Sequence, residues 1–345
     1  MASNSVPSTM RIWKYDSTDG GLEANLKLYS SEPLPKPGPS QHLIKVVAVG
    51  LNPVDYKAPE APIIGRLAVK KPAIPGFDVA GYIITPADGS SLEPGQLVFG
   101  AANSNPLGGG ALAEYVAAPA KAICRVPSGV SPLVAGGVPV AAGTAFASII
   151  PYVSKGSRVF INGGSGGVGT YAIQIAKAAG AHVTVSCSAR NVELCQSLGA
   201  DDILDYNARP LLDQLRGIAA AKPFDLVVDN VFNDPELYFQ AHTYTSPSAK
   251  FVEVASGPSL AFLRFALGAF LWPSFLGGGR RKIVFAAADI KEETLERIGN
   301  WIAEGVIKPV TDQVFPMEDV VDAFRRLKTG RARGKIIIDV AGARD

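Results

Sequence analysis

Residues 158–169 read RVFINGGSGGVG, and this stretch decides the fold of the chain. Residues 158–162 form a short apolar strand, and the glycines after it lead into a helical pattern at 171–179 that ends at Gly180. Gly164, Gly166 and Gly169 have the Gly-x-Gly-x-x-Gly spacing in the order strand, turn, helix. Such a turn lets the backbone approach a pyrophosphate at a helix N-terminus, so we predict a dinucleotide site.

The chain beyond this turn alternates short apolar strands with helical stretches, which predicts a parallel sheet covered by helices on both faces. Six strands fit a doubly wound, Rossmann-type α/β domain. The expected strands are 158–162, 182–187, 202–205, 225–229, 251–254 and 282–286.

The first 127 residues follow a different, β-rich pattern without a repeated βα unit. Strand-like runs at 42–49, 79–84 and 97–99 lie between Pro and Gly turns. Residues 292–304 and 317–328 read as two further helices, and residues 335–340 as a further strand. Six strands already complete the parallel sheet, so these elements are expected to belong to the first domain. We therefore predict one domain from 1–127 plus 300–345, and a dinucleotide-binding domain from 128–299.

Composition excludes several classes of protein. The chain has 345 residues, of which 47% are hydrophobic and 19% charged, so it can bury a sizeable core. Its 33 basic and 31 acidic residues give a net charge of +2 without a long basic run, which argues against a nucleic-acid partner. Three cysteines without Cys-x-x-Cys spacing and a polar N-terminus predict a cytoplasmic protein without a signal peptide.

The residues after the second strand of the sheet favour NADPH as the cofactor. An NAD site usually has an acidic residue about 20 positions beyond the first glycine, and residues 165–192 contain none. Ser188, Arg190 and Asn191 stand there instead, and hydroxyls with a guanidinium suit a 2′-phosphate. The alternative is that Arg190 is a solvated residue at the start of the next helix.

A hydrolase is the weaker interpretation of the same turn. Gly163, Ser165 and Gly167 match a Gly-x-Ser-x-Gly nucleophile elbow, and only His242 lies beyond the second strand as a partner base. A glycine-rich turn in this setting binds phosphate more readily than it activates a serine. We therefore expect contacts to the cofactor phosphates from Gly164, Ser165, Gly166, Gly167 and Val168.

Several short motifs, in order, resemble the medium-chain dehydrogenase/reductase superfamily in its zinc-free quinone and enone oxidoreductase branch. Plant chloroplast-envelope quinone oxidoreductase homologues and fungal enoyl reductases belong to this branch. The resemblance implies a GroES-like β-rich catalytic domain, a Rossmann-type domain and reduction in a cleft between them, and we expect a homodimer. The motifs are GLNPVDYK at 50–57, PGFDVAG at 75–81, GGGALAEY at 108–115, GTA at 143–145, SLGAD at 197–201 and GK at 334–335.

The chain departs from the zinc-dependent members of that superfamily at each catalytic ligand. Asn52 stands where the family has its first Cys, Phe77 at the His position, and Val140 near the second Cys. The resemblance therefore implies no metal. Without a Lewis acid to stabilise an alkoxide, reduction of an activated C=C bond or a quinone by NADPH remains.

The resemblance places the reactive end of the site on residues 52–57. Asn52 and Tyr56 are the candidate catalytic donors to the oxygen that gains negative charge, and Lys57 is expected to contact the cofactor. By their positions near strand ends and in the final Gly-Lys, Thr144, Tyr206, Asn230 and Lys335 are further candidate cofactor contacts. For Tyr56, packing or surface exposure without chemistry is the competing interpretation.

Two other functions stay open beside an NADPH-dependent reductase of a small apolar enone or quinone. Some relatives bind NADPH with little turnover, as lens crystallins do. Others are enoyl reductases that work beside a polyketide synthase on a carrier-bound thioester.

The apolar segment at 258–282 has three interpretations. It contains ten large hydrophobic residues between 260 and 276 and ends in GGGRRK at 277–282. Core or dimer packing, a lid over a hydrophobic substrate, and peripheral insertion into an anionic membrane all fit this composition. Arg264 and Pro273 interrupt it, and it is too short for a spanning helix.

Overall fold

The computed structural model describes residues 6–61, 64–105, 108–254, 260–273 and 278–342. Internal contacts divide the chain into two compact units. Unit 1 comprises Met1–Val140, Ile290–Ala303 and Thr311–Asp345, and unit 2 comprises Ala141–Asp289 and Glu304–Val310. We describe each unit separately.

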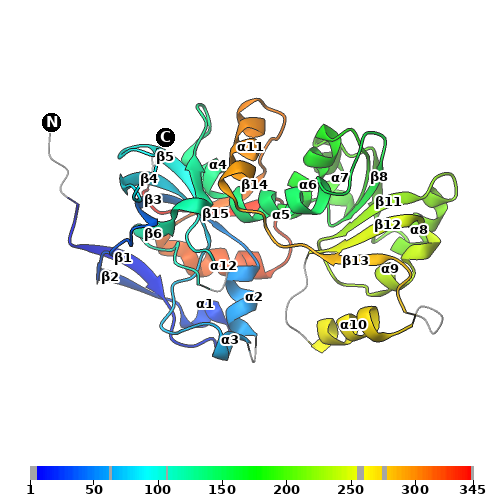
Figure 1. Cartoon of the computed structure of the whole chain (residues 1–345). Helices are drawn as coiled ribbons and strands as arrows, with labels where there is room; N and C mark the ends of the chain where they lie inside the picture. The colour runs from blue at the N-terminus through cyan, green and yellow to red at the C-terminus, as the bar shows by residue number, and fades with distance from the viewer. Residues whose placement is uncertain (1–5, 62–63, 106–107, 255–259, 274–277, 343–345) are drawn as a thin grey trace. The chain divides into compact units, whose positions relative to one another are not determined.

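Unit 1 is built on an antiparallel sheet with one parallel edge pair (Figure 1). The sheet order is β14-β15-β3-β4-β5-β7, β6 also pairs with β3, and β1 and β2 form a separate hairpin. The strands are β1 (Thr9–Lys14), β2 (Lys27–Pro33), β3 (Gln41–Leu51), β4 (Asp78–Thr85), β5 (Leu97–Ala101), β6 (Tyr115–Pro119), β7 (Ile123–Arg125), β14 (Thr311–Pro316) and β15 (Lys335–Asp339).

Short helices cover this sheet and close its core. They are α1 (Leu22–Asn25), α2 (Val54–Glu60), α3 (Ile64–Leu67), η1 (Ala120–Ala122), α4 (Pro132–Gly136), α11 (Glu292–Ala303), η5 (Met317–Asp319) and α12 (Val320–Lys328). The contact division differs from the junctions predicted near 127 and 300, because α4 packs on β3 and β4 and α11 packs on β7. The division of function between the two units stays a prediction.

Unit 2 contains the six-stranded parallel sheet that the sequence predicts. Its order, β10-β9-β8-β11-β12-β13, corresponds to 3-2-1-4-5-6 along the chain, which confirms the Rossmann-type prediction. The strands are β8 (Arg158–Asn162), β9 (His182–Cys187), β10 (Asp202–Asp205), β11 (Phe224–Asp229), β12 (Thr245–Glu253) and β13 (Lys282–Phe285).

Burial on both faces explains why these strands are almost continuously apolar. Val159, Phe160, Val183 and Val227 are each fully buried. The covering helices are α5 (Pro139–Ile149), which begins in unit 1, α6 (Gly167–Ala178), η2 (Ala189–Asn191), α7 (Val192–Ser197), α8 (Leu211–Ala219), α9 (Glu236–Phe239), η3 (Ala241–Thr243) and α10 (Leu260–Leu271).

The order of the strands reverses between β8 and β11, so the carboxyl ends of these two strands form the switch point of the sheet. Ligands of open α/β sheets bind at this point.

The apolar segment at 258–282 contributes α10, while residues 258–259 and 274–277 lie outside the described residues. Phe265 is buried, whereas Leu263, Phe270 and Trp272 are exposed. Among the described residues, no helix combines the length and apolar composition needed to cross a bilayer.

Candidate active site

The glycine turn between β8 and α6 is open to solvent at the switch point, and we call residues 164–168 the cradle. Gly163 has a φ of 80°, a conformation that L side chains rarely adopt, and Gly166 precedes the first residue of α6 without any side-chain cap. The N–H groups of the first helical turn therefore point outward without a capping partner. Residues 165–168 are only half-buried, so an anion can reach them.

Three glycines of the turn carry different steric constraints. A Cβ on Gly169 would lie 2.2 Å from the backbone oxygen of Gly163, and one on Gly164 would lie 2.9 Å from Cβ of Val185. These two glycines are needed for close packing of helix and strand. A Cβ on Gly166 would meet nothing closer than 3.7 Å, so this position faces open space.

Polar side chains near the carboxyl ends of neighbouring strands form hydrogen bonds with the start of the turn and with one another. We call Asn162, Ser186, Asp229 and Asn230 the switch-point cluster. Ser186 Oγ donates to Asn162 Oδ1 at 2.5 Å and accepts the Gly163 N–H at 3.0 Å. Asn162 Nδ2 donates to Asp229 Oδ1 at 2.8 Å, and Asn230 Nδ2 donates to the Asn162 carbonyl at 3.2 Å. The sheet thus fixes the start of the turn through side chains.

Two buried amide oxygens beside the turn have no hydrogen-bond partner among the described residues. Asn191 Nδ2 donates to Ser165 Oγ at 2.9 Å and to Ser188 Oγ at 3.3 Å, yet Asn191 Oδ1 accepts no hydrogen bond. Asn230 Oδ1 is likewise buried and unpartnered. Buried acceptors are normally paired, so these two suit donors from a bound ligand, such as ribose hydroxyls. A dinucleotide fits this set of residues.

The other residues of unit 2 that are predicted to contact the cofactor differ in their exposure to solvent. Arg190 is exposed in η2 and forms no hydrogen bond or ion pair with the described residues. Tyr206 follows β10 and is 51% exposed. Thr144 is buried within α5, where its carbonyl accepts the Ser148 hydroxyl at 2.7 Å. The structure joins Ser165, Ser188 and Asn191 by hydrogen bonds and records none that links Thr144 to them.

In unit 1, two predicted site residues belong to a buried ionic cluster of Asn52, Asp55, Asp78 and Lys335. Lys335 Nζ donates to the Leu51 carbonyl at 3.0 Å, to Asn52 Oδ1 and to Asp78 Oδ2 at 3.2 Å. Lys335 is 4% exposed and Asp78 is fully buried. In the structure, Lys335 is the buried counter-ion of Asp78. Its role as a cofactor contact stays a prediction.

The amide of Asn52 is also fully occupied within unit 1. Its Nδ2 donates to Asp78 Oδ2 at 2.9 Å and to the Gly50 carbonyl at 3.2 Å, while its oxygen accepts from Lys335. Donation to a substrate oxygen would require breaking one of these bonds. The catalytic assignment of Asn52 stays a prediction that this arrangement does not favour.

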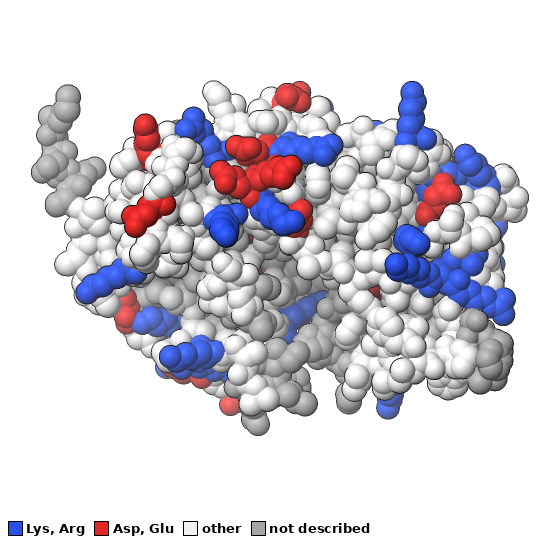
Figure 2. Space-filling view, in the orientation of Figure 1, with Lys and Arg blue, Asp and Glu red and all other residues white. Residues whose placement is uncertain are grey.

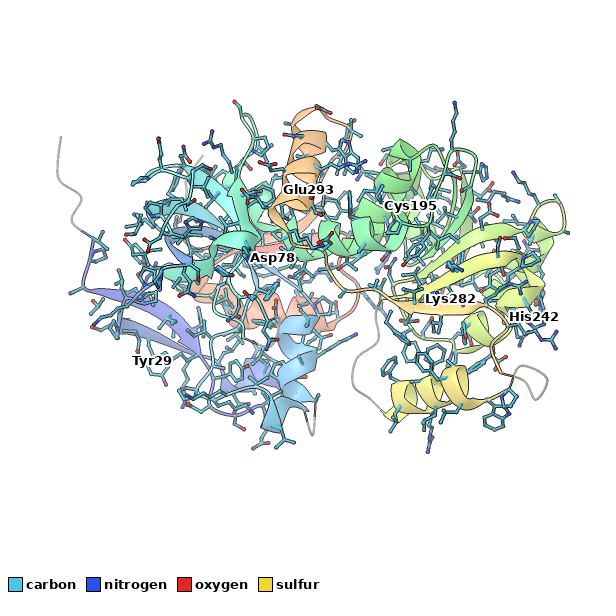
Figure 3. All side chains as sticks on the ribbon, in the orientation of Figure 1. Tyr29, Asp78, Cys195, His242, Lys282 and Glu293 are labelled. Carbon is cyan, nitrogen blue, oxygen red and sulfur yellow. The ribbon has the colours of Figure 1, made fainter. Side chains whose placement is uncertain are left out.

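Burial dominates the electrostatics of this ionic cluster. It raises the pKa of Asp55 to about 7, against the lowering effect of the Asn52 N–H bond and with a further increase from Asp78. Burial also raises the pKa of Asp78, which Lys335 opposes. Figure 3 labels Asp78 within unit 1.

Tyr56 and Lys57 lie on α2, immediately after this cluster, and both are half-buried. Lys328 Nζ lies 5.2 Å from the centroid of the Tyr56 ring. Burial raises the pKa of the Tyr56 hydroxyl, so the group stays protonated at neutral pH and can donate a hydrogen bond. No described residue forms a hydrogen bond with that hydroxyl.

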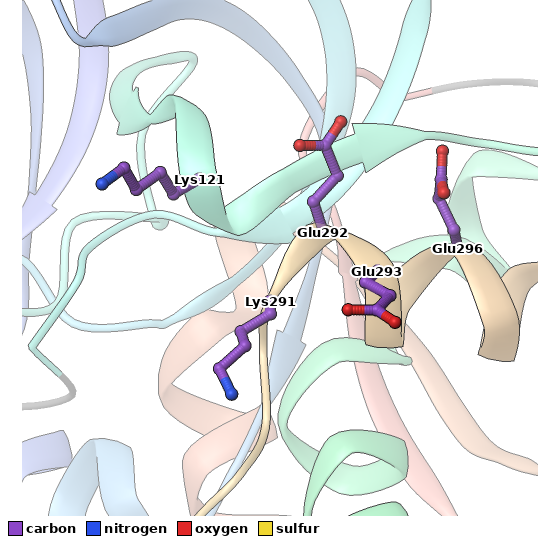
Figure 4. A pocket seen from close by; sticks show the side chains of 5 residues that line it. All are labelled: Lys121, Lys291, Glu292, Glu293 and Glu296. Atoms are coloured by element: carbon purple, nitrogen blue, oxygen red, sulfur yellow. The ribbon is translucent and has the colours of Figure 1, made fainter.

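The residues of unit 1 do not fit a catalytic zinc ion. Asn52 and Phe77 are buried without a thiol or imidazole, and the ammonium of Lys335 lies within the cluster where a metal would need ligands. Among the described residues, no group of three His, Cys, Asp or Glu side chains is placed to hold a metal. This also applies to the acidic pocket of Lys121, Lys291, Glu292, Glu293 and Glu296, whose charges face solvent (Figure 4).

Sequence reasoning missed the supporting polar residues of both units. Asn162 and Asp229 end their strands and Ser186 is the next-to-last residue of β9. A polar residue near the carboxyl end of a buried parallel strand is the signal that could have identified them. Asp55 and Asp78 stand within the quoted motifs, but the ammonium that bonds to Asp78 comes from Lys335 of β15, far along the chain.

Comparisons with known proteins match both units. The family model described as "Alcohol dehydrogenase GroES-like domain" matches residues 38–128, and the one described as "Zinc-binding dehydrogenase" matches residues 198–338. The chain is 43% identical over 355 residues to a trans-enoyl reductase, pgmF, of Aspergillus terreus, with 98% of each chain covered.

A plant relative and a solved structure agree with these matches. The chloroplast envelope quinone oxidoreductase homolog of Arabidopsis thaliana is 33% identical, over 96% of this chain and 98% of its own. The structure of the quinone oxidoreductase from Coxiella burnetii superimposes with a TM-score of 0.83 at 27% identity, over 96% of this chain and 99% of that chain.

Proposed function

The chain belongs to the medium-chain dehydrogenase/reductase family, in its quinone oxidoreductase and enoyl reductase branch, and from this premise we propose that it is a zinc-independent reductase that uses NADPH to reduce an activated C=C bond or a quinone. The observation that carries the proposal is the open cradle at the switch point of unit 2. Its uncapped helix N-terminus and two unpartnered buried acceptors match a dinucleotide.

The cradle residues have distinct roles in this proposal. The backbone of residues 164–168 would hold the pyrophosphate, with Asn191 and Asn230 accepting from ribose hydroxyls. Arg190 and Ser188 would contact the 2′-phosphate, because the Arg190 guanidinium is exposed and has no described partner. Lys57, Thr144, Tyr206 and Lys335 stay predictions as further contacts, and Lys335 has the least freedom to move.

The bound nicotinamide would supply a hydride to the carbon β to the substrate carbonyl. Negative charge then develops on the carbonyl oxygen, and a donor aimed at that oxygen can lower the barrier by about 3 kcal/mol. We assign this donor to Tyr56 in preference to Asn52. Burial raises the pKa of the Tyr56 hydroxyl and no described residue bonds to it, whereas the Asn52 amide is engaged. No step requires a metal.

The name of the Aspergillus relative favours an enoyl substrate over a quinone. A polyketide partner and a homodimer stay predictions. The homodimer can be tested by sedimentation velocity over a range of protein concentrations.

Two measurements test the proposed function. NADPH oxidation is followed against quinones, small enones, alkenals and enoyl thioesters, and we expect turnover with at least one class and the highest kcat/KM with an enoyl substrate. Turnover with none of them while NADPH still binds would support the crystallin-like alternative.

The second measurement compares NADPH binding by Gly166→Ala and Gly217→Ala. Both positions accept a methyl group without a clash, but only Gly166 lies in the cradle. We expect Gly166→Ala to weaken NADPH at least about tenfold, because a good charge-assisted contact contributes more than about 1.4 kcal/mol. Because Gly166 is the N-cap of α6, alanine there should lower thermal stability only slightly. Equal affinity in the two variants would contradict the assignment of the cradle.

A further inference from the structure

Helix α10 has two apolar faces, of which the fold buries only one. Phe265 is 3% exposed, and its ring centroid lies 5.0 Å from that of Phe232 and 5.7 Å from that of Phe239. This face belongs to the core of unit 2. A helix anchored in this way holds its opposite face in a fixed orientation.

The side of α10 away from Phe265 is apolar and largely exposed, although the centroid of the Phe270 ring lies 5.8 Å from that of Phe285 in β13. Leu263, Leu267, Phe270 and Leu271 are 54%, 50%, 64% and 73% exposed, and Trp272 follows at 60%. The first four have the spacing i, i+4, i+7 and i+8, which places them on one side of a helix. We call these five residues the α10 surface. So many large exposed hydrophobic side chains on one short helix indicate a binding surface.

A groove of about 1110 Å³ lies beside the C-terminal end of α10. The lining residues of the groove include Leu267, Leu271 and Trp272, together with Phe239 and His242 from the preceding segment. The groove therefore continues the α10 surface toward the beginning of β12.

Basic residues border this apolar region. Arg264 on α10 lines the groove, and Arg280 and Lys282 are exposed where the chain returns to β13. Burial is the largest cause of the lowered pKa of His242, and the charges of Arg280, Arg281 and Arg216 lower it further. Figure 2 shows Lys and Arg gathered over the part of unit 2 where β13 begins, and Figure 3 labels Lys282 and His242. The described groove lining includes one carboxylate, Glu236.

The groove lies away from the glycine turn of unit 2. Arg281 donates to the carbonyl and hydroxyl oxygens of Thr245, the first residue of β12, at 3.0 and 2.9 Å. The groove therefore lies toward the amino ends of the strands, whereas the glycine turn and the switch-point cluster lie at their carboxyl ends. In a parallel sheet these are opposite edges. Phe262 and Phe270 of α10 also pack against Phe285, at the carboxyl end of β13.

We propose that the α10 surface docks on an anionic membrane, with α10 lying in the plane of the interface. The apolar side chains would insert among the acyl chains, Trp272 would lie at the headgroup level, and Arg264 and Arg280 would contact lipid phosphates. A helix of 12 residues is too short to span the bilayer but suits this orientation.

Charge favours a lipid surface over a second copy of the chain. A symmetric dimer places the same patch on both sides of its interface, so docking through the α10 surface would bring two sets of the same basic residues to one interface. An anionic bilayer complements these charges.

The test is co-sedimentation of the full chain with vesicles of phosphatidylcholine containing phosphatidylserine, without cofactor or substrate, so it is independent of the proposed reaction. We expect binding to these vesicles at low salt, at least about tenfold weaker binding to pure phosphatidylcholine, and weakening by salt. A blue shift of tryptophan fluorescence that disappears in Trp272→Phe would place this residue at the interface.

Two pairs of substitutions separate the contribution of the apolar side chains to vesicle binding from that of the basic side chains. Phe270→Ser with Leu271→Ser should reduce vesicle binding at least about tenfold, and Arg264→Gln with Arg280→Gln about tenfold or more, since each basic residue near the surface contributes roughly a factor of five. The matched controls are Val314→Ser, which removes an exposed apolar side chain of unit 1, and Arg125→Gln, which removes an exposed charge there. Both controls should bind as the wild type does.

Three results would overturn the proposal. The first is no binding of the wild type to anionic vesicles at low salt. The second is a concentration-dependent dimer that Phe270→Ser with Leu271→Ser abolishes, which would identify a second copy as the occupant. The third is equal binding by the α10 variants and their controls.

Discussion

Each unit contains a buried polar cluster, and the two clusters differ in how completely their groups are paired. In unit 1, Lys335 bonds to Asn52 and Asp78, and the amide of Asn52 uses both its nitrogen and its oxygen. In unit 2, Asn230 of the switch-point cluster and Asn191 beside the glycine turn each retain a buried oxygen that accepts no hydrogen bond from a described residue. The cluster of unit 1 is closed, whereas the cluster of unit 2 leaves acceptors available at the edge of a sheet.

This difference distinguishes buried polar groups that stabilise the fold from buried polar groups that are available to a ligand. A closed ionic cluster depends on its paired charges, because removing Lys335 or Asp78 leaves the other buried charge without its partner. An open cluster loses little stability when a ligand contact is removed, since that contact is made to a molecule outside the fold. Substitutions in unit 1 should therefore mainly affect stability, and substitutions in unit 2 should mainly affect cofactor affinity.

The largest effect is expected for Lys335→Met. The substitution leaves Asp78 buried without its counter-ion, so we expect unit 1 to lose about 3 to 5 kcal/mol in its free energy of unfolding. Urea unfolding in a Trp272→Phe background measures this, because Trp13 and Trp301 then report on unit 1 alone. Adding Asp78→Asn should recover part of the loss, and a wild-type midpoint for Lys335→Met would show that the cluster is not closed.

A pH effect of up to a few kcal/mol is expected from Asp55. Its folded pKa of about 7 lies above the ordinary value, so the folded state holds a proton that the unfolded state has lost. The free energy of unfolding of unit 1 should therefore fall as pH rises from about 4 to about 7, by up to about 1.4 kcal/mol per pH unit from this group.

Asp55→Asn should remove this pH dependence and make unit 1 more stable than the wild type at pH 8. Asp88→Asn, at an exposed carboxylate, is the control and should keep the wild-type slope. A slope that survives in Asp55→Asn would assign the titration to another group.

A smaller effect, confined to the cofactor, is expected for Arg190→Ala. Loss of the pairing with the 2′-phosphate should weaken NADPH by roughly 2 kcal/mol, about 30-fold, and leave NADH and stability unchanged. Calorimetric titration with both cofactors measures the difference, with Arg125→Ala as the control. Equal weakening of NADPH and NADH would instead indicate a structural role for Arg190.

No effect is expected from removal of metal. Asn52, Phe77 and Val140 supply no thiol or imidazole for zinc, so chelation should leave both activity and urea midpoint unchanged. Stoichiometric zinc in the purified protein that is lost together with activity would contradict this expectation.

The parallel sheet could be predicted from sequence because its signals are local. Strands β8 and β9 have the predicted bounds, and the glycine turn joins residues that are neighbours in the chain. The closed cluster could not be predicted in this way, since Asp78 and Lys335 are separated by 257 positions and meet only through the pairing of strands. The position of Lys335 in the final Gly-Lys pair predicts a cofactor contact and gives no sign of its bond to Asp78.

Side-chain direction was the other quantity that sequence could not supply. Phe265 and Phe270 belong to one apolar run of similar composition, yet one is buried and the other is 64% exposed. Helical spacing puts the two on different sides of α10, but which side faces the sheet depends on Phe232, Tyr238 and Phe239, which come from earlier segments of the chain.

The late position of Lys335 in the chain has a consequence for synthesis on the ribosome. All six strands of unit 2 lie between residues 158 and 285, so its sheet can assemble before the last 60 residues are made. Unit 1 must wait, because β15 pairs with β3 and delivers the ammonium that Asp78 requires. The N-terminal half of the chain, although translated first, is therefore expected to finish folding last, and a nascent chain arrested before residue 335 should contain a folded unit 2 and a protease-sensitive unit 1.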